Sequence, residues 1–256
     1  MSRDSVIEAR SLNLTFATND GPVHALSDVN LTINKGDFVS FIGPSGCGKT
    51  TFLRALAALE KPTSGTIQVN GLTPDEARQK RAYGYVFQHA GLYPWRTIAG
   101  NIKLPLEIMG YSKSQQLRRT DDVLRLVELE DFAKKYPWQL SGGMQQRVGL
   151  ARALATDADI LLMDEAFSAL DPLIRTDMQN ILLDLQQELH KTIVFITHDL
   201  EEALRIGDQI AILRDGEVIH EGTPQQIVLK PKDDYIADFT KDINRGRVIQ
   251  LKTIMK

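Results

Sequence analysis

One glycine-rich run, placed between a strand and a helix, constrains the fold of this chain more than any other feature. The run, Gly43-Pro44-Ser45-Gly46-Cys47-Gly48-Lys49-Thr50, fits the pattern G-x-x-x-x-G-K-[ST]. It follows the apolar, β-branched residues 38–42 and precedes residues 51–59, whose apolar side chains recur at helical spacing. The order strand, glycine loop, helix predicts a phosphate-binding loop in an α/β fold. An incidental glycine turn with a lysine beside it is the alternative.

The residue types in this run suit the phosphate groups of a nucleotide. Glycines allow backbone angles and close approach that a side chain would prevent, so consecutive N–H groups can surround phosphates at the positive end of a helix. Lys49 adds a positive charge, and the hydroxyl of Thr50 is a hard oxygen ligand of the kind that Mg²⁺ prefers. Cys47 occupies an unrestricted position, and we assign it no chemistry. The predicted ATP-binding residues here are Gly43, Pro44, Ser45, Gly46, Cys47, Gly48, Lys49, Thr50 and Thr51.

A second candidate site follows the apolar run 160–163, which ends in Asp164 and Glu165. Ligands of α/β folds lie at the carboxyl ends of parallel strands. We expect Asp164 to reach Mg²⁺ directly or through water, and Glu165 to polarise the water that attacks the γ-phosphate. Adjacent Asp and Glu residues are common on surfaces, so this prediction depends on the phosphate loop being present as well.

The pattern of apolar and polar residues predicts an antiparallel β region first and a mainly parallel core sheet afterwards, with a helical subdomain at about 91–155. The runs 29–33 and 38–42 flank the turn 34–37, which predicts a region rich in hairpins. Nearly continuous apolar strands separated by helices indicate a buried parallel sheet. The other predicted strands are 66–70, 83–87, 160–163, 192–197 and 209–213, and the predicted helices are 112–131, 176–190 and one beyond residue 224.

The length and composition of the chain limit its class. Its 256 residues allow one large α/β domain but hardly two, so we expect a single domain at 5–240 and a tail at 241–256. The net charge of −3 gives no support for binding to nucleic acid, and we interpret the basic pair Arg118-Arg119 as a solvated helix face.

The single cysteine and the lack of long apolar stretches indicate where in the cell the chain is expected to work. Cys47 is the only cysteine, which excludes an internal disulfide and a multi-cysteine metal site and fits a reducing compartment. Residues 1–12 lack the apolar block of a secretory signal, and no stretch approaches the ~20 apolar residues of a membrane span. We therefore expect any membrane role to come through a partner.

The run Leu140-Ser141-Gly142-Gly143-Met144-Gln145-Gln146-Arg147 resembles the signature motif of the ABC ATPases. Small residues at a helix start offer free N–H groups and a positive dipole end to an anion. A second phosphate-binding motif is superfluous in a monomer. The resemblance implies that the signature of one subunit closes over the ATP of the other, with Ser141, Gly142, Gly143 and Asp171 as contacts across the dimer.

The remaining motifs of this family occur in order between residues 7 and 227. Phe16 resembles the aromatic residue that stacks on adenine, and Gln88 resembles the glutamine that senses Mg²⁺ and the attacking water. Residues 168–171 resemble the D-loop, and His198 resembles the switch histidine that contacts the γ-phosphate. Taken singly, Phe16 is more often a core residue, Gln88 a solvated turn and His198 a satisfied histidine at a strand end.

The loop 89–97 carries Tyr93 and Trp95, and we expect it to help form a groove that receives a helix of a membrane subunit. Local packing of these aromatic side chains is the alternative.

The resemblance implies the ATP-hydrolysing subunit of an import system, at the cytoplasmic face of the cell's inner membrane. It implies a homodimer, integral membrane permease subunits and, indirectly, a periplasmic or lipid-anchored substrate-binding protein. The runs 164–175 and 234–245 are similar to the glycine betaine/proline (quaternary amine) branch. The nitrate/sulfonate/taurine branch is the alternative, and it more often has proline where this chain has Ala166. Many osmoprotectant ATPases continue into CBS modules; the sequence ends at Lys256, so we do not expect gating by such modules.

Proteins of other classes fit the motifs less well. A soluble, non-transport ABC ATPase usually carries a long coiled-coil insertion or two cassettes in tandem. A P-loop kinase leaves residues 140–147 unexplained, and a non-catalytic regulator would be expected to lose Lys49 or Glu165. The transported solute does not touch this subunit, so the motifs do not identify it.

Overall fold

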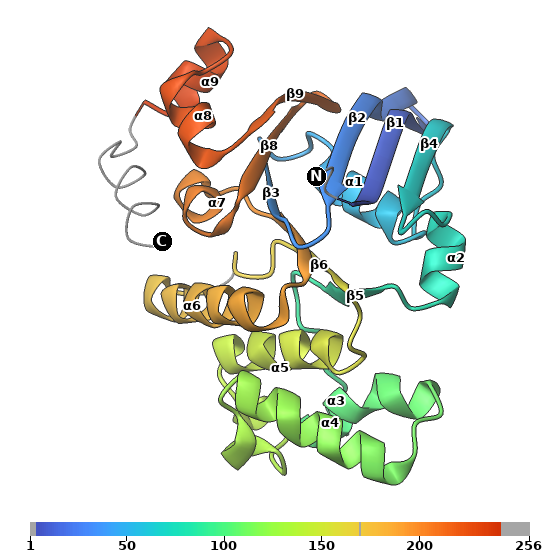
Figure 1. Ribbon diagram of the computed structural model, residues 1–256, viewed down its shortest axis with the longest axis vertical. Helices are drawn as coiled ribbons and strands as arrows, with labels where there is room; N and C mark the ends of the chain where they lie inside the picture. The colour runs from blue at the N-terminus through green and yellow to red at the C-terminus, as the bar shows by residue number, and fades with distance from the viewer. Residues whose placement is uncertain (1–3, 169, 242–256) are drawn as a thin grey trace. The chain divides into compact units, whose positions relative to one another are not determined.

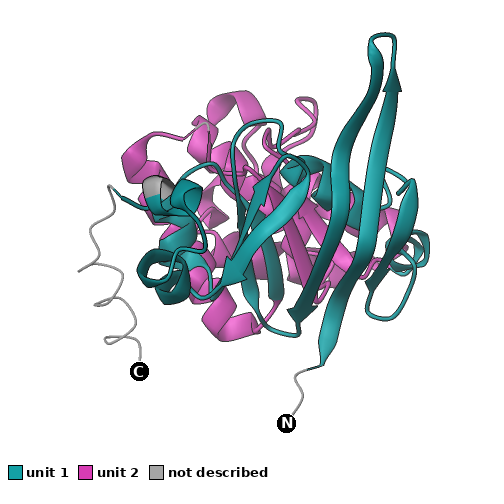
Figure 2. Cartoon of the chain, turned by 90° about the horizontal axis from the view of Figure 1, so that it is seen from above, with its two compact units in different colours: residues 1–80, 192–256 teal, residues 81–191 magenta. Residues whose placement is uncertain are grey.

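The computed structural model describes residues 4–168 and 170–241. The chain divides into two compact units: unit 1 contains residues 1–80 and 192–256, and unit 2 contains residues 81–191 (Figures 1 and 2). The predicted α/β class, with an antiparallel N-terminal region and parallel core strands, is confirmed. The boundaries at 5–240 and 91–155 stay predictions, and residues 242–256 of the predicted tail lie outside the described residues.

A three-stranded antiparallel sheet forms the first part of unit 1. Strands β1 (Ser5–Thr18) and β2 (Gly21–Asn34) form a long hairpin, visible in Figure 2, and β4 (Ser64–Val69) pairs with the other edge of β1. Strand β4 ends in a tight turn at Asn70 and Gly71, which both have positive φ. This turn leads to α2 (Pro74–Gln79), which Thr73 and Glu76 cap reciprocally.

The second sheet of unit 1 holds the buried parallel strands. Strand β3 (Phe38–Ile42) pairs in parallel with β7 (Thr192–Ile196) on one side and with β8 (Gln209–Arg214) on the other, and β9 (Glu217–Gly222) adds an antiparallel edge. Every residue of β3 and β7 is buried, as expected for a strand covered on both faces. Helix α1 (Lys49–Leu56) follows β3.

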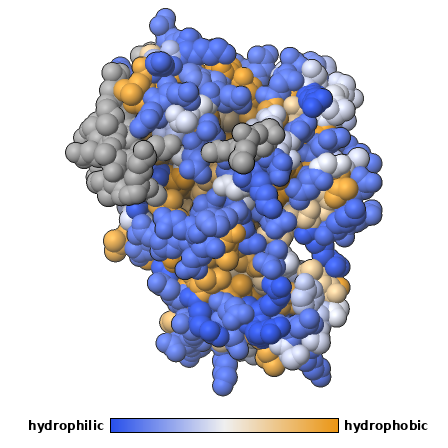
Figure 3. Space-filling view, in the orientation of Figure 1, coloured by the Kyte–Doolittle hydropathy of each residue, from blue (hydrophilic) through white to orange (hydrophobic). Residues whose placement is uncertain are grey.

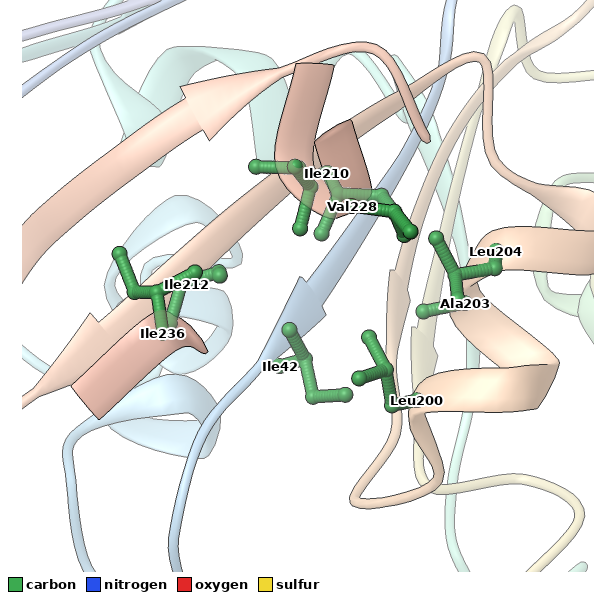
Figure 4. Close-up of a cluster of buried hydrophobic side chains, with 9 residues drawn as sticks. Ile42, Leu200, Ala203, Leu204, Ile210, Ile212, Val228 and Ile236 are labelled. Carbon is green, nitrogen blue, oxygen red and sulfur yellow. The ribbon is translucent and has the colours of Figure 1, made fainter. Parts of the chain in front are cut away.

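One apolar cluster packs the C-terminal helices of unit 1 against this sheet (Figure 4). Ile42 of β3 and Ile210 and Ile212 of β8 meet side chains from α7 (Leu200–Ile206), α8 (Pro224–Leu229) and α9 (Asp234–Phe239). Burial of such side chains is worth about 1.5–3 kcal/mol each, so this cluster fixes α7 against the end of β3.

Unit 2 is mainly helical. Its two strands, β5 (Tyr83–Val86) and β6 (Ile160–Asp164), pair in parallel. Its helices are α3 (Ile98–Ile108), α4 (Lys113–Leu126), α5 (Gly142–Leu154) and α6 (Pro172–Leu189), with 3₁₀ turns at Glu130–Phe132 and Pro137–Gln139. Figure 3 shows a largely hydrophilic face on which apolar side chains gather over the helices of unit 2. Within residues 4–168 and 170–241, no helix combines the length and the apolar character needed to cross a membrane.

The structure corrects several sequence predictions. The runs 29–33 and 38–42 are strands, but they lie in different sheets, and the hairpin is formed by β1 and β2 instead. The helix predicted at 112–131 ends at Leu126, because the chain turns at Glu128, whose φ is +58°. The helix predicted at 176–190 begins at Pro172, since the side chain of Asp171 caps it.

One member of the basic pair on α4 is also less solvated than predicted. The Arg119 side chain is 33% exposed, forms an ion pair with Asp157 at 3.3 Å and lies 5.7 Å from the ring of Tyr111. Arg118 is exposed, as a solvated helix face predicts, whereas Arg119 is half-buried and paired.

Candidate functional site

The glycine run forms a tight loop between β3 and α1. Gly43, Gly46 and Gly48 have φ values of +155°, +81° and +104°. A β-carbon would lie 2.1 Å from the Leu213 carbonyl oxygen at Gly43, and 2.4 Å from the Ala25 carbonyl oxygen at Gly48. Glycine is therefore required at both positions by backbone angle and by close approach.

Lys49 is held across this loop. Its side chain is 5% exposed, and Nζ donates to the carbonyl oxygens of Gly43 at 2.8 Å and Pro44 at 3.0 Å. Gly48 precedes α1 without a capping side chain, so the helix N-terminus retains N–H groups for an anion. Thr50 is exposed and Thr51 is half-buried. The loop therefore presents a fixed ammonium group together with main-chain donors.

Cys47 belongs to the loop, and it is buried. Its Sγ is 3.8 Å from Nζ of Lys49, and its main-chain atoms bond to Pro44 and Gly216. Burial raises the pKa of the Cys47 thiol, and the nearby Lys49 opposes this only in part. The side chain is thus a buried, protonated thiol that packs the loop.

Strands β5 and β6 bring the predicted acidic residues together with Gln88. Val86 is paired with Met163, so the residues that follow the two strands lie side by side. Gln88 Nε2 lies 3.5 Å from Glu165 Oε2 and 3.4 Å from Ser168 Oγ, and the Tyr85 hydroxyl donates to Asp164 Oδ2 at 3.3 Å. Glu165 has a φ of +44°, a conformation that is strained for a residue with a side chain.

Two side chains of α5 hold the chain that follows β5. Gln146, which is buried, donates from Nε2 to the carbonyl oxygen of Gln88. Arg152 donates to the carbonyl oxygens of Ala90 and Gly91. Helix α5, which begins at the predicted signature residues, is thus bonded directly to the main chain around Gln88.

The predicted dimer contacts lie at two adjacent helix starts. Ser141 caps α5, with its Oγ accepting from the Met144 N–H at 3.3 Å, and Asp171 caps α6 by accepting from the Ile174 N–H at 3.1 Å. Gly143 packs against Ile174, which brings the two helices together. Gly142 is exposed, and a β-carbon there would meet no described atom within 4 Å.

A groove of about 420 Å³ lies on unit 2 next to the predicted docking loop. Its lining includes Phe87, Tyr93, Ile108 and Arg152. Asn101, fully buried, accepts from the Tyr93 N–H at 2.7 Å and donates to three carbonyl oxygens of the loop. Tyr93 therefore lines the groove on a backbone that Asn101 holds, and the exposed ring of Trp95 lies next to that of Tyr93.

The comparisons with known proteins identify the family of this chain. The family described as ABC transporter matches residues 26–168, more than half of the chain. The chain belongs to the ABC transporter family, as an ATP-binding domain.

Curated relatives of this ATP-binding domain are transport proteins. The glycine betaine transport ATP-binding protein of Bacillus subtilis (strain 168) is 46% identical over 243 residues, a match that covers 92% of this chain and 58% of the relative. The trimethylamine N-oxide transport system ATP-binding protein of Ruegeria pomeroyi (strain ATCC 700808 / DSM 15171 / DSS-3) is 44% identical over 237 residues, with 90% and 70% covered. The first three relatives are matched over 58%, 61% and 59% of their length, so the chain spans about three-fifths of them.

Solved ABC cassettes share the fold. A dimeric bacterial ABC transporter cassette has a TM-score of 0.75 and 40% sequence identity, and the match covers 85% of this chain and 98% of that one. A dimeric cassette in a post-hydrolysis state, bound to ADP and Pi, has a TM-score of 0.74 and 38% identity, with 85% and 98% covered.

The predicted site residues of the ATP-binding domain fall into two sets. Unit 1 holds the glycine run and Thr51, Phe16 on β1 opposite Val23, and the exposed His198 after β7. Within unit 2, the contacts described above join Gln88 to Glu165 and place Ser141, Gly142, Gly143 and Asp171 at adjacent helix starts. Assembly of the two sets around one nucleotide stays a prediction.

Sequence reasoning missed the residues that support this site. Gln146, Arg152 and Ile174 lie on helices, and Thr197 and Glu202 flank His198. Gln146 could have been noticed, because it is a polar residue within the apolar face of α5. The other residues gave no signal in the sequence, because their partners are distant in sequence or are main-chain atoms. Ala169 of the predicted D-loop lies outside the described residues.

Proposed function

We propose that this chain is the ATP-hydrolysing subunit of an ABC import system. The observation that carries the proposal is the phosphate loop, in which Lys49 is held across Gly43 and Pro44 at the start of α1. An ammonium group and the N–H groups at a helix N-terminus together suit the β- and γ-phosphates of ATP. Phe16, an aromatic residue on β1, is proposed to stack on the adenine.

We propose that Glu165 polarises the attacking water and that Gln88 and His198 take part in the same hydrolysis. The contact between Gln88 and Glu165 favours this, since both can bond to one water molecule that enters between them. The positive φ of Glu165 is a strained conformation of the kind that clusters at reacting sites, which supports this role. His198 would contact the γ-phosphate from the end of β7.

The residues present fit a magnesium ion bound together with the nucleotide. Among residues 4–168 and 170–241, no cluster of three or more His, Cys, Asp or Glu side chains could hold a metal by itself. Mg²⁺ is usually bound by one or two carboxylates with substrate phosphates, and we propose that Asp164, Thr50 and Gln88 supply its oxygen ligands from the protein. The ion would neutralise charge on the phosphate oxygens.

A homodimer follows from the second anion-binding motif. Ser141, Gly142, Gly143 and Asp171 lie at two helix starts that pack together, away from the glycine loop in sequence. We propose that they close over the ATP held by a second copy of the chain. Cassettes related to this chain have been solved as dimers, which supports the proposal.

We propose that the groove on unit 2 receives a helix of an integral membrane permease, which places the chain at the cytoplasmic face of the cell's inner membrane as a peripheral subunit. The exposure of Trp95, at 70%, favours a partner over local packing. A periplasmic or lipid-anchored substrate-binding protein would act through that permease.

We propose glycine betaine, proline or a related quaternary amine as the solute. The relatives at 42–46% identity named for glycine betaine, carnitine and choline support this. A nitrate/sulfonate/taurine importer is the alternative, and a soluble ABC ATPase outside transport is the alternative of a different class.

The activity is tested with the purified chain. Lys49→Ala should lower kcat/KM for ATP by about 10²-fold or more, because the phosphates lose their fixed cation. Lys61→Ala, an exposed lysine of the same unit, is the matched control. Equal ATPase rates in the two variants would contradict the proposal.

The solute is tested in cells that lack this chain. Uptake of labelled glycine betaine should return with the wild-type chain and not with Lys49→Ala, while taurine and nitrate uptake stay unchanged. A neighbouring reading frame for a binding protein with an aromatic cage would support the quaternary amine. Restored taurine or nitrate uptake would favour the alternative branch.

A further inference from the structure

Three hydrogen bonds close a ring around the backbone of His198. The Thr197 hydroxyl donates to the Glu202 carboxylate. The Asp199 N–H donates to Thr197 Oγ1 at 3.0 Å, and the Glu202 N–H donates to Asp199 Oδ1 at 3.2 Å. His198 itself is exposed, and both of its neighbours, Thr197 and Asp199, take part in these bonds.

Two of the three ring residues are buried and Asp199 is half-buried, although His198 is exposed. Thr197 is 3% exposed and Glu202 is 5% exposed. A buried carboxylate is destabilising unless it is hydrogen-bonded. The buried carboxylate of Glu202 therefore depends on donors such as the Thr197 hydroxyl. Helix α7, which carries Glu202, is itself fixed because Leu200 and Ala203 pack into the cluster around Ile42 (Figure 4).

The ring is also bonded to the strand that leads into the phosphate loop. The Thr197 N–H donates to the carbonyl oxygen of Phe41 at 3.1 Å, and Phe41 lies two residues before Gly43. Strand β3 of unit 1 therefore contacts the residue before His198 and leads directly into the phosphate loop.

We propose that Thr197 and Glu202 are positioning residues that hold the imidazole of His198 at a fixed place relative to the phosphate loop. This inference rests on the proposed role of His198 in hydrolysis. Without the ring, the turn after β7 would gain backbone freedom that it must lose on reaching the reactive geometry. Thr197 acts through His198 and makes no contact with ATP.

The hydroxyl of Thr197 is removed without changing side-chain size by Thr197→Val, and it is kept by Thr197→Ser. Thr192→Val is the matched control, because Thr192 is 1% exposed, lies at the other end of β7 and accepts a hydrogen bond from the Gly36 N–H at 2.9 Å. All variants of the full chain are compared by thermal unfolding and by kcat and KM for ATP.

We expect Thr197→Val to lower kcat by about tenfold to a hundredfold, as a misplaced catalytic group does, with little change in KM. Thr197→Ser should recover most of kcat, and Thr192→Val should lose stability but keep kcat. Wild-type kcat in Thr197→Val, or equal losses of kcat in Thr197→Val and Thr192→Val, would overturn the inference.

The double variant separates positioning from general damage. If Thr197 acts only through His198, Thr197→Val should cause no further loss in a His198→Ala background. If the losses of kcat from the two substitutions multiply in the double variant, the positioning role of Thr197 is overturned and the proposed role of His198 is not. Wild-type kcat in His198→Ala would instead overturn the proposed role of His198, and the inference with it.

Discussion

A β-carbon on Gly143 would lie 2.3 Å from Cγ2 of Ile174, closer than two carbon atoms can approach. The contact joins the starts of α5 and α6, which carry Ser141 and Asp171 as caps. The methyl group of Ile174 lies on a branched carbon, so it cannot move aside as the end of a long side chain could. The small size of Gly143 is thus a packing requirement, separate from any role in phosphate binding.

We predict that Gly143→Ala destabilises the protein by about 1–3 kcal/mol through overpacking against Ile174. Thermal or urea unfolding measures this. Gly142→Ala is the control, since its β-carbon meets no described atom within 4 Å. Gly142→Ala should keep the unfolding midpoint but lower ATPase activity if a partner's phosphate lies there. Equal unfolding midpoints for the two variants would show that the contact between Gly143 and Ile174 does not prevent a larger side chain at residue 143.

The second prediction concerns Glu165→Gln. Loss of the carboxylate that polarises water should reduce turnover by about 10²–10⁴-fold, while nucleotide binding is retained. The chain should then accumulate as an ATP-bound dimer, which size-exclusion chromatography detects. An ATP-bound monomer at the same protein concentration would contradict the proposed sandwich.

The third prediction tests the groove on unit 2. Tyr93 and Trp95 are 40% and 70% exposed, and their rings lie 5.2 Å apart. The double variant Tyr93→Ala/Trp95→Ala should leave the basal ATPase rate of the isolated chain unchanged and reduce transport in the assembled system. Leu117→Ala, an exposed apolar residue on α4, is the control. Full transport with the double variant would disprove the role of this loop.

The fourth prediction follows from burial of Cys47, which raises its thiol pKa. Alkylation by N-ethylmaleimide should be slower than for a free thiol at about pH 7, because the thiolate is the reactive form and it is less populated, and should rise as pH approaches about 10. The folded state holds the thiol proton more tightly than the unfolded state. Stability from this group is therefore complete below the ordinary thiol pKa and is lost as pH rises through the folded value.

Cys47→Ala is the variant that checks the second part of this prediction. Its unfolding midpoint should depend less on pH between about pH 8 and about pH 10 than that of the wild-type chain. An unchanged pH dependence, or alkylation at the rate of a free thiol, would contradict a buried Cys47.

The main functional segments could be predicted from sequence because their requirements are local. The loop from Gly43 to Thr50 depends on backbone angles that glycine supplies, and a strand and a helix are readable on either side of it. The buried strand before Asp164 and the helix start at Ser141 are likewise marked by residues next to them in the chain. Strands 29–33 and 38–42 were found, but their sheets were not, since sheet membership depends on partners far away in sequence.

What the sequence by itself determined is therefore the family and the phosphate loop, and it predicted which groups react. Only the tertiary structure decided how these groups are supported: Gln146 bonds to the main chain of Gln88, Ile174 fills the space beside Gly143, and Glu202 with Thr197 holds the backbone of His198. The physical reason is that a turn or a cap is fixed by neighbouring residues, whereas a buried hydrogen bond or a packing contact is fixed by whichever distant side chain the fold brings within reach.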